Sequence, residues 1–479
     1  MGNLKHTGAA LLALTGLLPA GDVWARQNIM IGELSIGYDF QDRNYKQGST
    51  SVNSDSENTR NLFASPRVRL SSRDVSDLLE FTYAPTFTYD DIDSSHFVGH
   101  DLGLLAEKNI NRNWLVRATD SYFKGEDPVA DNERRGAAII PGGVEPVTSI
   151  GAGPPADAPR ELSDIDGRQR YWRNDFGLST DYTYAQDSVV GVGYNFGVLR
   201  YDDNGVANNE SDYDRHEGIG RLSYRFNAQW QAETEVSYVK GIYDEPSSSV
   251  LPSSSALNVA NEDLEEYHGR IRANYSWRPH DVYFGEYSYA ETVYEDESLN
   301  NSTIHEFTLG WNHDFSPRLR MTLSGGPSLV TFEEGDDETG YNAYAGLIYT
   351  FQQATLSAST SYGYEYDNFD GLQSGLSKTW RSELGYSYRF TPELEASFTA
   401  GYERSDYEQP GGITTAFDSD RLNYTRETYD AGLTVGYGFL RYYTLAASYR
   451  YADNSEPGDN YDEHRVLLTL TAAHEIFRW

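Results

Sequence analysis

The histidine and acidic side chains are the residues of this chain whose types could do chemistry. The histidines stand singly and lack the close spacing of metal ligands, so we expect no metal site. An acidic run from Glu333 to Glu338 offers oxygen ligands for Ca²⁺, but it lacks the ordered loop pattern that fixes such a site. A solvated, charged loop is the simpler interpretation of that run.

Catalytic and nucleotide-binding motifs are absent from the sequence. There is no Gly-x-Ser-x-Gly elbow, no phosphate-binding loop and no His-Glu-x-x-His pair. Gly191, Gly193 and Gly197 lie in an alternating segment that no helix pattern follows, so we interpret them as small inward residues of a strand. Cysteine is also absent, which excludes disulfide scaffolds and thiol chemistry. We therefore expect no enzyme, no catalytic residue and no cofactor.

The charged residues become informative when they are sorted by their alternation along the chain. Side chains of a strand point to opposite faces with a period of two. From Leu79 to Tyr89, one face is apolar or aromatic and the other carries Glu80 and threonines. The same sorting places many charged residues on the polar face of the other segments. The candidates for lining a lumen are Arg67, Arg69, Arg221, Arg225, Glu233, Glu235, Arg270, Arg272, Glu306, Arg389, Glu395 and Glu403.

These polar-face charges have two interpretations. The first is structural, because opposite charges directly across a sheet stabilise it by roughly 0.2–1 kcal/mol per pair. Short turns predict that Arg221 opposes Glu235 and that Arg389 opposes Glu395. The second interpretation is a polar conduit whose mixed charges tune what passes through it. The structural ladder is the simpler of the two.

The elements that carry these residues are long alternating segments. Many run for about ten residues or more, whereas strands of soluble proteins average about five or six. Long strands with one apolar face are typical of barrels that cross a bilayer, and short and long connections alternate between them. We predict an all-β fold: a single transmembrane antiparallel β-barrel over residues 26–479, with about twenty strands (roughly 18–22) and both ends on the short-turn side. In the last segment a change of parity before Phe477 predicts a bulge or a slip of register.

Aromatic residues recur at the ends of these segments. Aromatics make up 14% of the chain, which argues against disorder. Because amphipathic rings settle at the headgroup level of a bilayer, we interpret the tryptophans as membrane-interface anchors. These are Trp114, Trp172, Trp230, Trp277, Trp311 and Trp479.

Two stretches lie outside this pattern. Residues 1–25 combine a weakly positive start, a short apolar core and a small-residue site before Arg26, which predicts a secretory signal peptide. Residues 125–168 are rich in proline and glycine and have little periodicity, so we expect a long loop that is either external or folded into the lumen.

The net charge of −35 bears on the partners of the protein. Recognition of phosphate backbones depends on clustered lysine and arginine, so we expect no nucleic acid partner. Acidic loops are compatible with a rim that meets lipopolysaccharide through divalent cations. Outer-membrane lipid and lipopolysaccharide are therefore the expected surroundings.

Several segments share a sequence pattern with a known family. Leu394–Tyr402 and Leu356–Tyr364 alternate small polar and apolar residues. The turns at 389–394 and 314–319 read Arg-Phe-Thr-Pro-Glu-Leu and Asp-Phe-Ser-Pro-Arg-Leu, and residues 37–40 read Gly-Tyr-Asp-Phe. These stretches resemble the β-barrel porin type 2 family of Gram-negative outer membranes. The resemblance implies a porin-like barrel in the outer membrane, often associated with exopolysaccharide secretion. Because a periplasmic helical-repeat domain is absent, it also implies a separate periplasmic partner for export.

The expected size of the lumen leads to the functional hypotheses. Twenty tilted strands imply a diameter of roughly 40 Å, which side chains alone do not fill. The leading hypothesis is a porin-like channel that exports an extracellular polysaccharide. The alternatives are general diffusion of small solutes and a structural sheath around an electron-transfer cytochrome. An outer-membrane enzyme is disfavoured because no Ser/His/Asp grouping is evident.

Overall fold

The structure is a computed structural model that describes residues 26–46, 57–126, 170–202, 212–244, 263–295, 301–333, 335–369, 375–408, 423–456 and 460–479. The expected signal peptide at 1–25 lies outside these residues, as does the expected long loop from residue 127 onward. No helix in the described ranges is long and apolar enough to cross a membrane.

The described residues form twenty strands. The first ten are β1 (Gln27–Tyr45), β2 (Glu57–Arg73), β3 (Asp77–Asp90), β4 (Ser95–Asn111), β5 (Trp114–Gly125), β6 (Tyr171–Ala185), β7 (Ser188–Tyr201), β8 (Tyr213–Arg225), β9 (Trp230–Tyr243) and β10 (Leu264–Arg278). The others are β11 (Asp281–Tyr294), β12 (Ser302–Ser316), β13 (Leu319–Phe332), β14 (Glu338–Thr350), β15 (Ala354–Asp367), β16 (Gly375–Arg389), β17 (Leu394–Glu408), β18 (Asn423–Phe439), β19 (Tyr443–Ser455) and β20 (Tyr461–Arg478).

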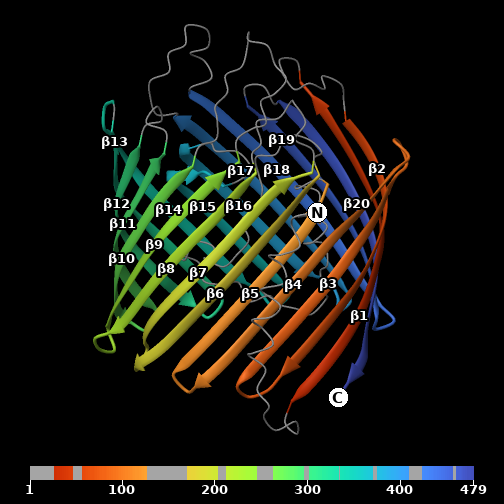
Figure 1. The fold of residues 1–479 in the computed structure, drawn as a ribbon, viewed down its shortest axis with the longest axis horizontal. Coiled ribbons are helices and arrows are strands. Elements are labelled where there is room, and N and C mark those ends of the chain that lie inside the picture. Colours follow the sequence, from red (N-terminus) through yellow and green to blue (C-terminus); the bar gives the residue numbers. More distant parts are fainter. Residues whose placement is uncertain are drawn as a thin grey trace.

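Each strand pairs antiparallel with its neighbours in sequence, and the first and last strands close the sheet. Strand β1 pairs with β2 on one side and with β20 on the other, so the twenty strands form one closed barrel (Figure 1). Closure leaves no free sheet edge, which is the condition for placing backbone hydrogen bonds in lipid. The predicted fold class and strand number are confirmed.

The strands are long enough to cross a bilayer. The shortest, β5, has 12 residues and the longest, β1, has 19. At about 3.4 Å per residue and a tilt of about 45°, a strand as short as β5 spans roughly 30 Å, which matches the hydrocarbon core.

The two ends of the barrel differ in their connections. At one end, here called the turn end, short turns join the strands, and the backbone amide of Asn28 donates a hydrogen bond to the carbonyl of Trp479 at 2.9 Å. Several of these turns need the left-handed backbone region, as at Asp187 (φ 52°) and Arg441 (φ 65°). The other end, here called the loop end, carries the longer connections. One connection at the loop end is short: residues 91–94 form a tight turn between β3 and β4. The sequence pattern did not predict this turn.

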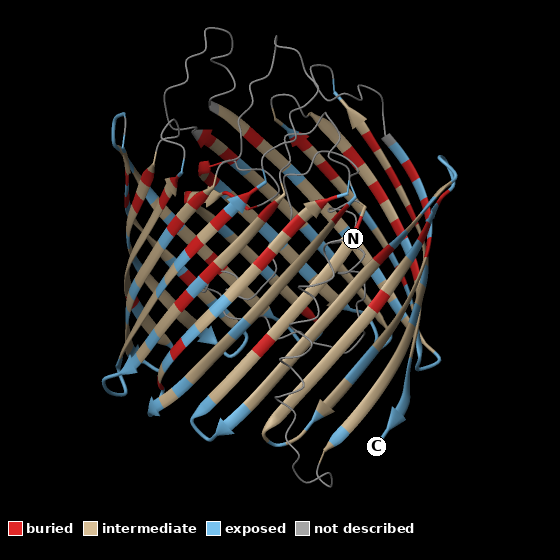
Figure 2. Cartoon of the chain, viewed as in Figure 1, coloured by how far each residue is buried: buried red, intermediate tan, exposed pale blue. Residues whose placement is uncertain are grey.

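The two faces of the barrel wall differ in polarity. Apolar side chains stand exposed on the outer face, as Leu309 (75%) and Val236 (55%) do at mid-strand. Residues of opposite parity face inward and are mostly polar. Figure 2 shows that the buried positions gather in the loop-end half of the strands, whereas the turn end is largely exposed. The inner wall is therefore most tightly packed toward the loop end.

The last strand contains the predicted irregularity. Met30 on β1 pairs with Phe477, but the next residue, Ile31, pairs with Glu475, so Ile476 is an extra residue in β20. The bulge restores the apolar parity of the final residues, and it lies where the two ends of the chain meet.

Candidate functional site

The inner wall at the turn end surrounds a polar cavity. The cavity has a volume of about 580 Å³ and lies against β4–β10. Its charged inner-face residues come from neighbouring strands and are Asp181, Arg221, Glu233, Glu235 and Arg270. Four of these five residues belong to the set that the sequence places on the polar face.

The ion pairs around this cavity are long. The Arg221 guanidinium lies 3.6 Å from the Asp181 carboxylate, and that of Arg270 lies 3.8 Å from both Glu235 and Glu286. Hydrogen bonds between nitrogen and oxygen fall at about 2.7–3.2 Å. Arg221 and Arg270 are also about one-third exposed. These cationic groups are therefore held loosely and can meet a solute in the cavity.

The cross-strand pairs predicted from sequence are borne out in register. Arg221 stands opposite Glu235, and Arg389 stands opposite Glu395. Arg389 also contacts Glu395 at 3.5 Å, but the ion-pair partner of Arg221 is Asp181 on β6, across the intervening strand β7. Register follows from the turn, whereas the choice between two flanking carboxylates depends on side-chain geometry.

The remaining lumen candidates are distributed around the wall, and most contact polar neighbours. Arg67 contacts Glu33 at 3.2 Å, Arg225 contacts Asp187 at 2.9 Å and Arg272 contacts Glu286 at 3.6 Å. Glu403 contacts Arg381 at 2.8 Å, the Ser328 hydroxyl donates to Glu306 at 2.8 Å, and the Asn274 amide donates to Glu233 at 3.2 Å. Arg69 stands opposite Thr82. Of the lumen candidates, the structure therefore brings only Arg221, Glu233, Glu235 and Arg270, on β8–β10, together at this cavity.

Toward the loop end some ion pairs are short, and one of them is fully buried. Arg43 contacts Glu463 at 2.7 Å, and Arg173 contacts Asp175 at 2.6 Å. The Arg43 and Glu463 side chains are each only 3% exposed. Buried charges of this kind are bound to each other, so they define the wall and are not free to meet a solute.

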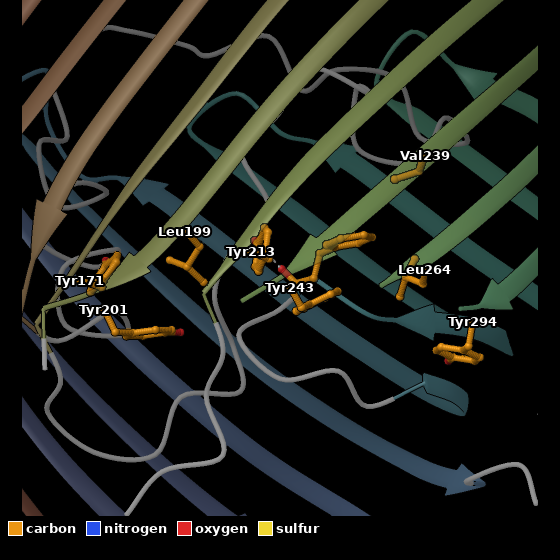
Figure 3. Packing of buried hydrophobic residues seen from close by; sticks show 9 residues of the cluster. Tyr171, Leu199, Tyr201, Tyr213, Val239, Tyr243, Leu264 and Tyr294 are labelled. Carbon is orange, nitrogen blue, oxygen red and sulfur yellow. Dashed lines mark hydrogen bonds between the residues drawn. The ribbon is translucent and has the colours of Figure 1, made fainter. Parts of the chain in front are cut away.

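A band of tyrosines lines the inner wall at the loop end of β6–β11. Its residues are Tyr171, Tyr201, Tyr213, Tyr243 and Tyr294, all buried, and Leu199, Val239 and Leu264 belong to the same buried cluster (Figure 3). We call these five residues the tyrosine band.

The alternation pattern alone does not single out the tyrosine band, because tyrosines are frequent on both faces of the barrel. A signal exists at the strand ends. Tyr201 and Tyr243 each close a strand directly before an aspartate, and Tyr294 closes one before a glutamate. Tyr213 opens a strand directly after Asp212.

Asp212 lies directly before β8 at the loop end and contacts the tyrosine band at Tyr201. Its carboxylate accepts a hydrogen bond from the backbone amide of Tyr201 at 2.7 Å. Burial raises the pKa of Asp212 above its ordinary value, although this hydrogen bond and the nearby Arg200 act in the opposite direction. Asp212 thus fixes the start of β8 against the end of β7.

Residues that follow β15, a strand not adjacent to the band in the sheet, reach the tyrosine band. The connection after β15 carries Asn368 and Phe369, and Phe369 packs in the same buried cluster as Tyr213 and Tyr243. Strands β11–β14 separate β15 from β10 in the sheet, so this contact crosses the interior. The loop end of the lumen is therefore narrowed from within.

The tryptophans lie near the two ends of the wall. Trp114, Trp230, Trp277 and Trp479 are exposed at the turn end. Trp172 stands at the loop end with its ring 6.0 Å from that of Tyr122, and the Trp311 indole donates to Asp281 at 3.1 Å. Trp380 is also exposed on the outer face (46%), although the pattern of segment ends does not predict it.

The described residues contain no group of three or more histidine, aspartate or glutamate side chains that could hold a metal ion. The chemistry that the inner wall offers is ion pairing, hydrogen bonding and aromatic packing.

Comparisons with known proteins agree with the architecture. No protein-family model and no curated protein matches the chain. Among solved structures, the FrpB iron transporter from Neisseria meningitidis has a TM-score of 0.51 and 8% identity, over 93% of this chain and 82% of that one. A variant of the ferric enterobactin receptor PfeA from Pseudomonas aeruginosa in complex with enterobactin has a TM-score of 0.50 and 9% identity, over 93% and 81%. OccAB4 from Acinetobacter baumannii has a TM-score of 0.41 and 11% identity, over 93% and 98%.

At such identities the likeness to FrpB and PfeA concerns the fold. Because no family model matches, the similarity to the porin type 2 family remains a resemblance of sequence segments. The chain is a large closed antiparallel β-barrel, similar in fold to FrpB and PfeA.

Proposed function

We propose that the protein is an outer-membrane channel of a Gram-negative bacterium that exports an extracellular polysaccharide, with its loop end facing outward. The observation that carries the proposal is the composition of the inner wall. It combines mixed, mutually paired charges with a tyrosine band at the loop end.

This composition suits a sugar chain for a physical reason. A polysaccharide presents hydroxyl groups at its edges and C–H surfaces on the faces of its rings. Paired arginines and carboxylates offer hydrogen bonds without a strip of one charge that would trap or repel the polymer. Tyrosine rings offer flat surfaces with a polar tip. The inner wall would therefore stay hydrated and would make weak, repeated contacts with the passing polysaccharide.

The surroundings of the barrel follow from its outer face. Exposed apolar side chains between tryptophan-bearing ends fit lipid, and the acidic loops fit lipopolysaccharide bridged by divalent cations. The polymer must be delivered from the other side of the membrane, so a periplasmic export partner belongs to the proposal.

Deletion of the gene tests the proposal. We expect surface polysaccharide to disappear and to return when the wild-type gene is supplied on a plasmid. Unchanged surface polymer together with altered uptake of small solutes would reject export in favour of general diffusion. Copurification of a haem protein with the barrel would instead support the cytochrome sheath.

Single-channel recording in planar bilayers provides a second test. A general diffusion porin gives a wide, constantly open pore. The contact of Phe369 with the tyrosine band favours a narrower, mostly closed state for this barrel. A stable, wide-open conductance of the purified wild-type protein would contradict the export proposal.

A further inference from the structure

Phe369, which follows β15, fills a specific pocket in the wall formed by β8 and β9. Its side chain is only 1% exposed. The ring meets Tyr213 edge-on with centroids 5.4 Å apart and lies nearly parallel to Tyr243 at 6.1 Å. The guanidinium of Arg215 stands 5.4 Å from the ring centroid. Aromatic rings and a cation thus surround Phe369, and all of them come from β8 and β9.

The backbone beside Phe369 is held by hydrogen bonds from the same wall. The Tyr213 hydroxyl donates to the carbonyl of Phe369 at 3.0 Å, and the Tyr243 hydroxyl donates to the carbonyl of Asn368. The side-chain amide of Asn368 donates to the carboxylate of Glu266 on β10 at 2.7 Å. Asn368 and Glu266 are 1% and 2% exposed. Side chains of three neighbouring strands, β8, β9 and β10, therefore hydrogen-bond to Asn368 and Phe369.

The wall is shaped for the Phe369 ring. Gly241 on β9 lies under the ring, and a Cβ atom at that position would be 2.8 Å from the Phe369 Cζ. Any larger residue at position 241 would close this space.

The ends of β15 and β16 are fixed to the wall on the near side of the pocket. The Tyr366 hydroxyl donates to the carbonyl of Ser302 at 2.8 Å. Leu376 packs in a second buried cluster with Ile304 and Val330. Asn368 and Phe369 thus extend from the anchored end of β15.

The groups that bind Asn368 and Phe369 are of the kinds that bind sugar rings: hydrogen-bonding side chains and aromatic faces. When these two residues leave, the pocket presents two phenol hydroxyls, the Glu266 carboxylate, the Arg215 guanidinium and two aromatic surfaces. Phenols and carboxylates exchange hydrogen bonds with hydroxyl groups, and aromatic faces pack against the C–H faces of pyranose rings.

We propose that Asn368 and Phe369 are a built-in stopper of the lumen, and that the pocket they occupy binds a sugar ring of the exported polymer when the stopper moves. This inference rests on the proposed export function for the identity of the ligand. The stopper itself rests on geometry alone, because two residues that follow β15 are buried against β8–β10, five to seven strands away in the sheet.

Single-channel conductance tests the stopper without any substrate. We expect Phe369→Ala to raise the conductance severalfold or to lengthen the open time by a similar factor. Phe307→Ala is the matched control, because Phe307 lies on the outer face and is 56% exposed, so its loss leaves the lumen unchanged. Wild-type conductance in Phe369→Ala would overturn the stopper.

A cross-link tests the same contact by making it permanent, whereas Phe369→Ala removes it. The chain has no cysteine, so Asn368→Cys combined with Glu266→Cys introduces the only two thiols. Joining them with a short thiol-specific reagent should abolish openings, and each single variant treated in the same way should still open. Normal openings after verified cross-linking would overturn the proposal even if Phe369→Ala failed to fold.

Soluble linear glucan oligosaccharides test the pocket. We expect them to interrupt the current through Phe369→Ala, with at least severalfold fewer interruptions after Tyr213→Phe and Tyr243→Phe are added. An open Phe369→Ala channel that glucans never interrupt would overturn the sugar-binding role and leave the stopper standing. The gene deletion tests the export function separately from these recordings. A failure of the export proposal can therefore be distinguished from a failure of the stopper or of the sugar pocket.

Discussion

Arg465 on β20 and Asp39 on β1 form a two-pronged ion pair across the seam that closes the barrel. Their two hydrogen bonds, Nε to Oδ1 and a terminal nitrogen to Oδ2, are both 2.8 Å long. Each side chain is only 1% exposed. The first and last strands of the chain are thus joined by a buried, geometrically fixed contact.

Removing one partner of this pair should destabilise the barrel strongly. We expect Arg465→Met to lower the free energy of unfolding by about 3–5 kcal/mol, because it leaves the Asp39 carboxylate buried without its counter-charge. Urea unfolding in lipid vesicles, followed by tryptophan fluorescence, measures the change. Arg478→Ala is the control, because its pair with Glu475 is exposed to solvent and should contribute little to stability. Equal effects of the two variants would contradict this prediction.

Gly241→Ala should act like a partial removal of Phe369. The added methyl group would lie 2.8 Å from the Phe369 Cζ and 2.9 Å from its Cε1, so the ring must leave or shift. Overpacking of this kind costs about 1–3 kcal/mol at the contact. We expect more frequent channel openings in planar bilayers. Gly436→Ala provides the control, since a methyl group there meets nothing within 4 Å. If both variants conduct like the wild type, the tight fit at Gly241 does not hold the lumen closed.

A charge on the outer face should be costly, and one on the inner face should not. Leu309 is 75% exposed and lies at the middle of β12. We expect Leu309→Arg to destabilise the barrel in lipid by about 2–4 kcal/mol. Thr308→Arg, one residue away on the inner face, should cost much less. Unfolding of both variants from vesicles measures the difference. A larger cost for the inner substitution would refute the assignment of the two faces.

The arginines at the turn-end cavity should set the ion selectivity of the open channel. Arg270→Gln removes a loosely paired positive charge from the cavity wall, so the permeability ratio should shift toward K⁺ over Cl⁻. The reversal potential in a KCl gradient, recorded with the stopper removed by Phe369→Ala, measures the shift. Arg441→Gln makes the same change of charge in an exposed turn between β18 and β19, where we expect no shift. An unchanged reversal potential for Arg270→Gln would argue that solutes avoid this cavity.

Much of the fold can be predicted from local patterns in the sequence. Alternation assigns the face of each residue because the strand period is two, and a short turn such as the one after Arg225 fixes the register of the strands it joins. The position of Arg221 opposite Glu235 follows from these two rules. The change of parity before Phe477 likewise predicts the bulge at Ile476.

The candidate site is less accessible from sequence, because its contacts join strands that are distant around the barrel. Arg221 chooses Asp181 over Glu235 through side-chain reach, which no pairing rule contains. The contact of Phe369 with Tyr213 depends on the curvature of the closed wall, because only closure places the connection after β15 against β8. The sequence by itself determined which residues face lipid and which face the lumen, since that depends on alternation alone. Only the tertiary structure decided which inner residues meet across the lumen, because closing the sheet brings together strands that no local pattern relates.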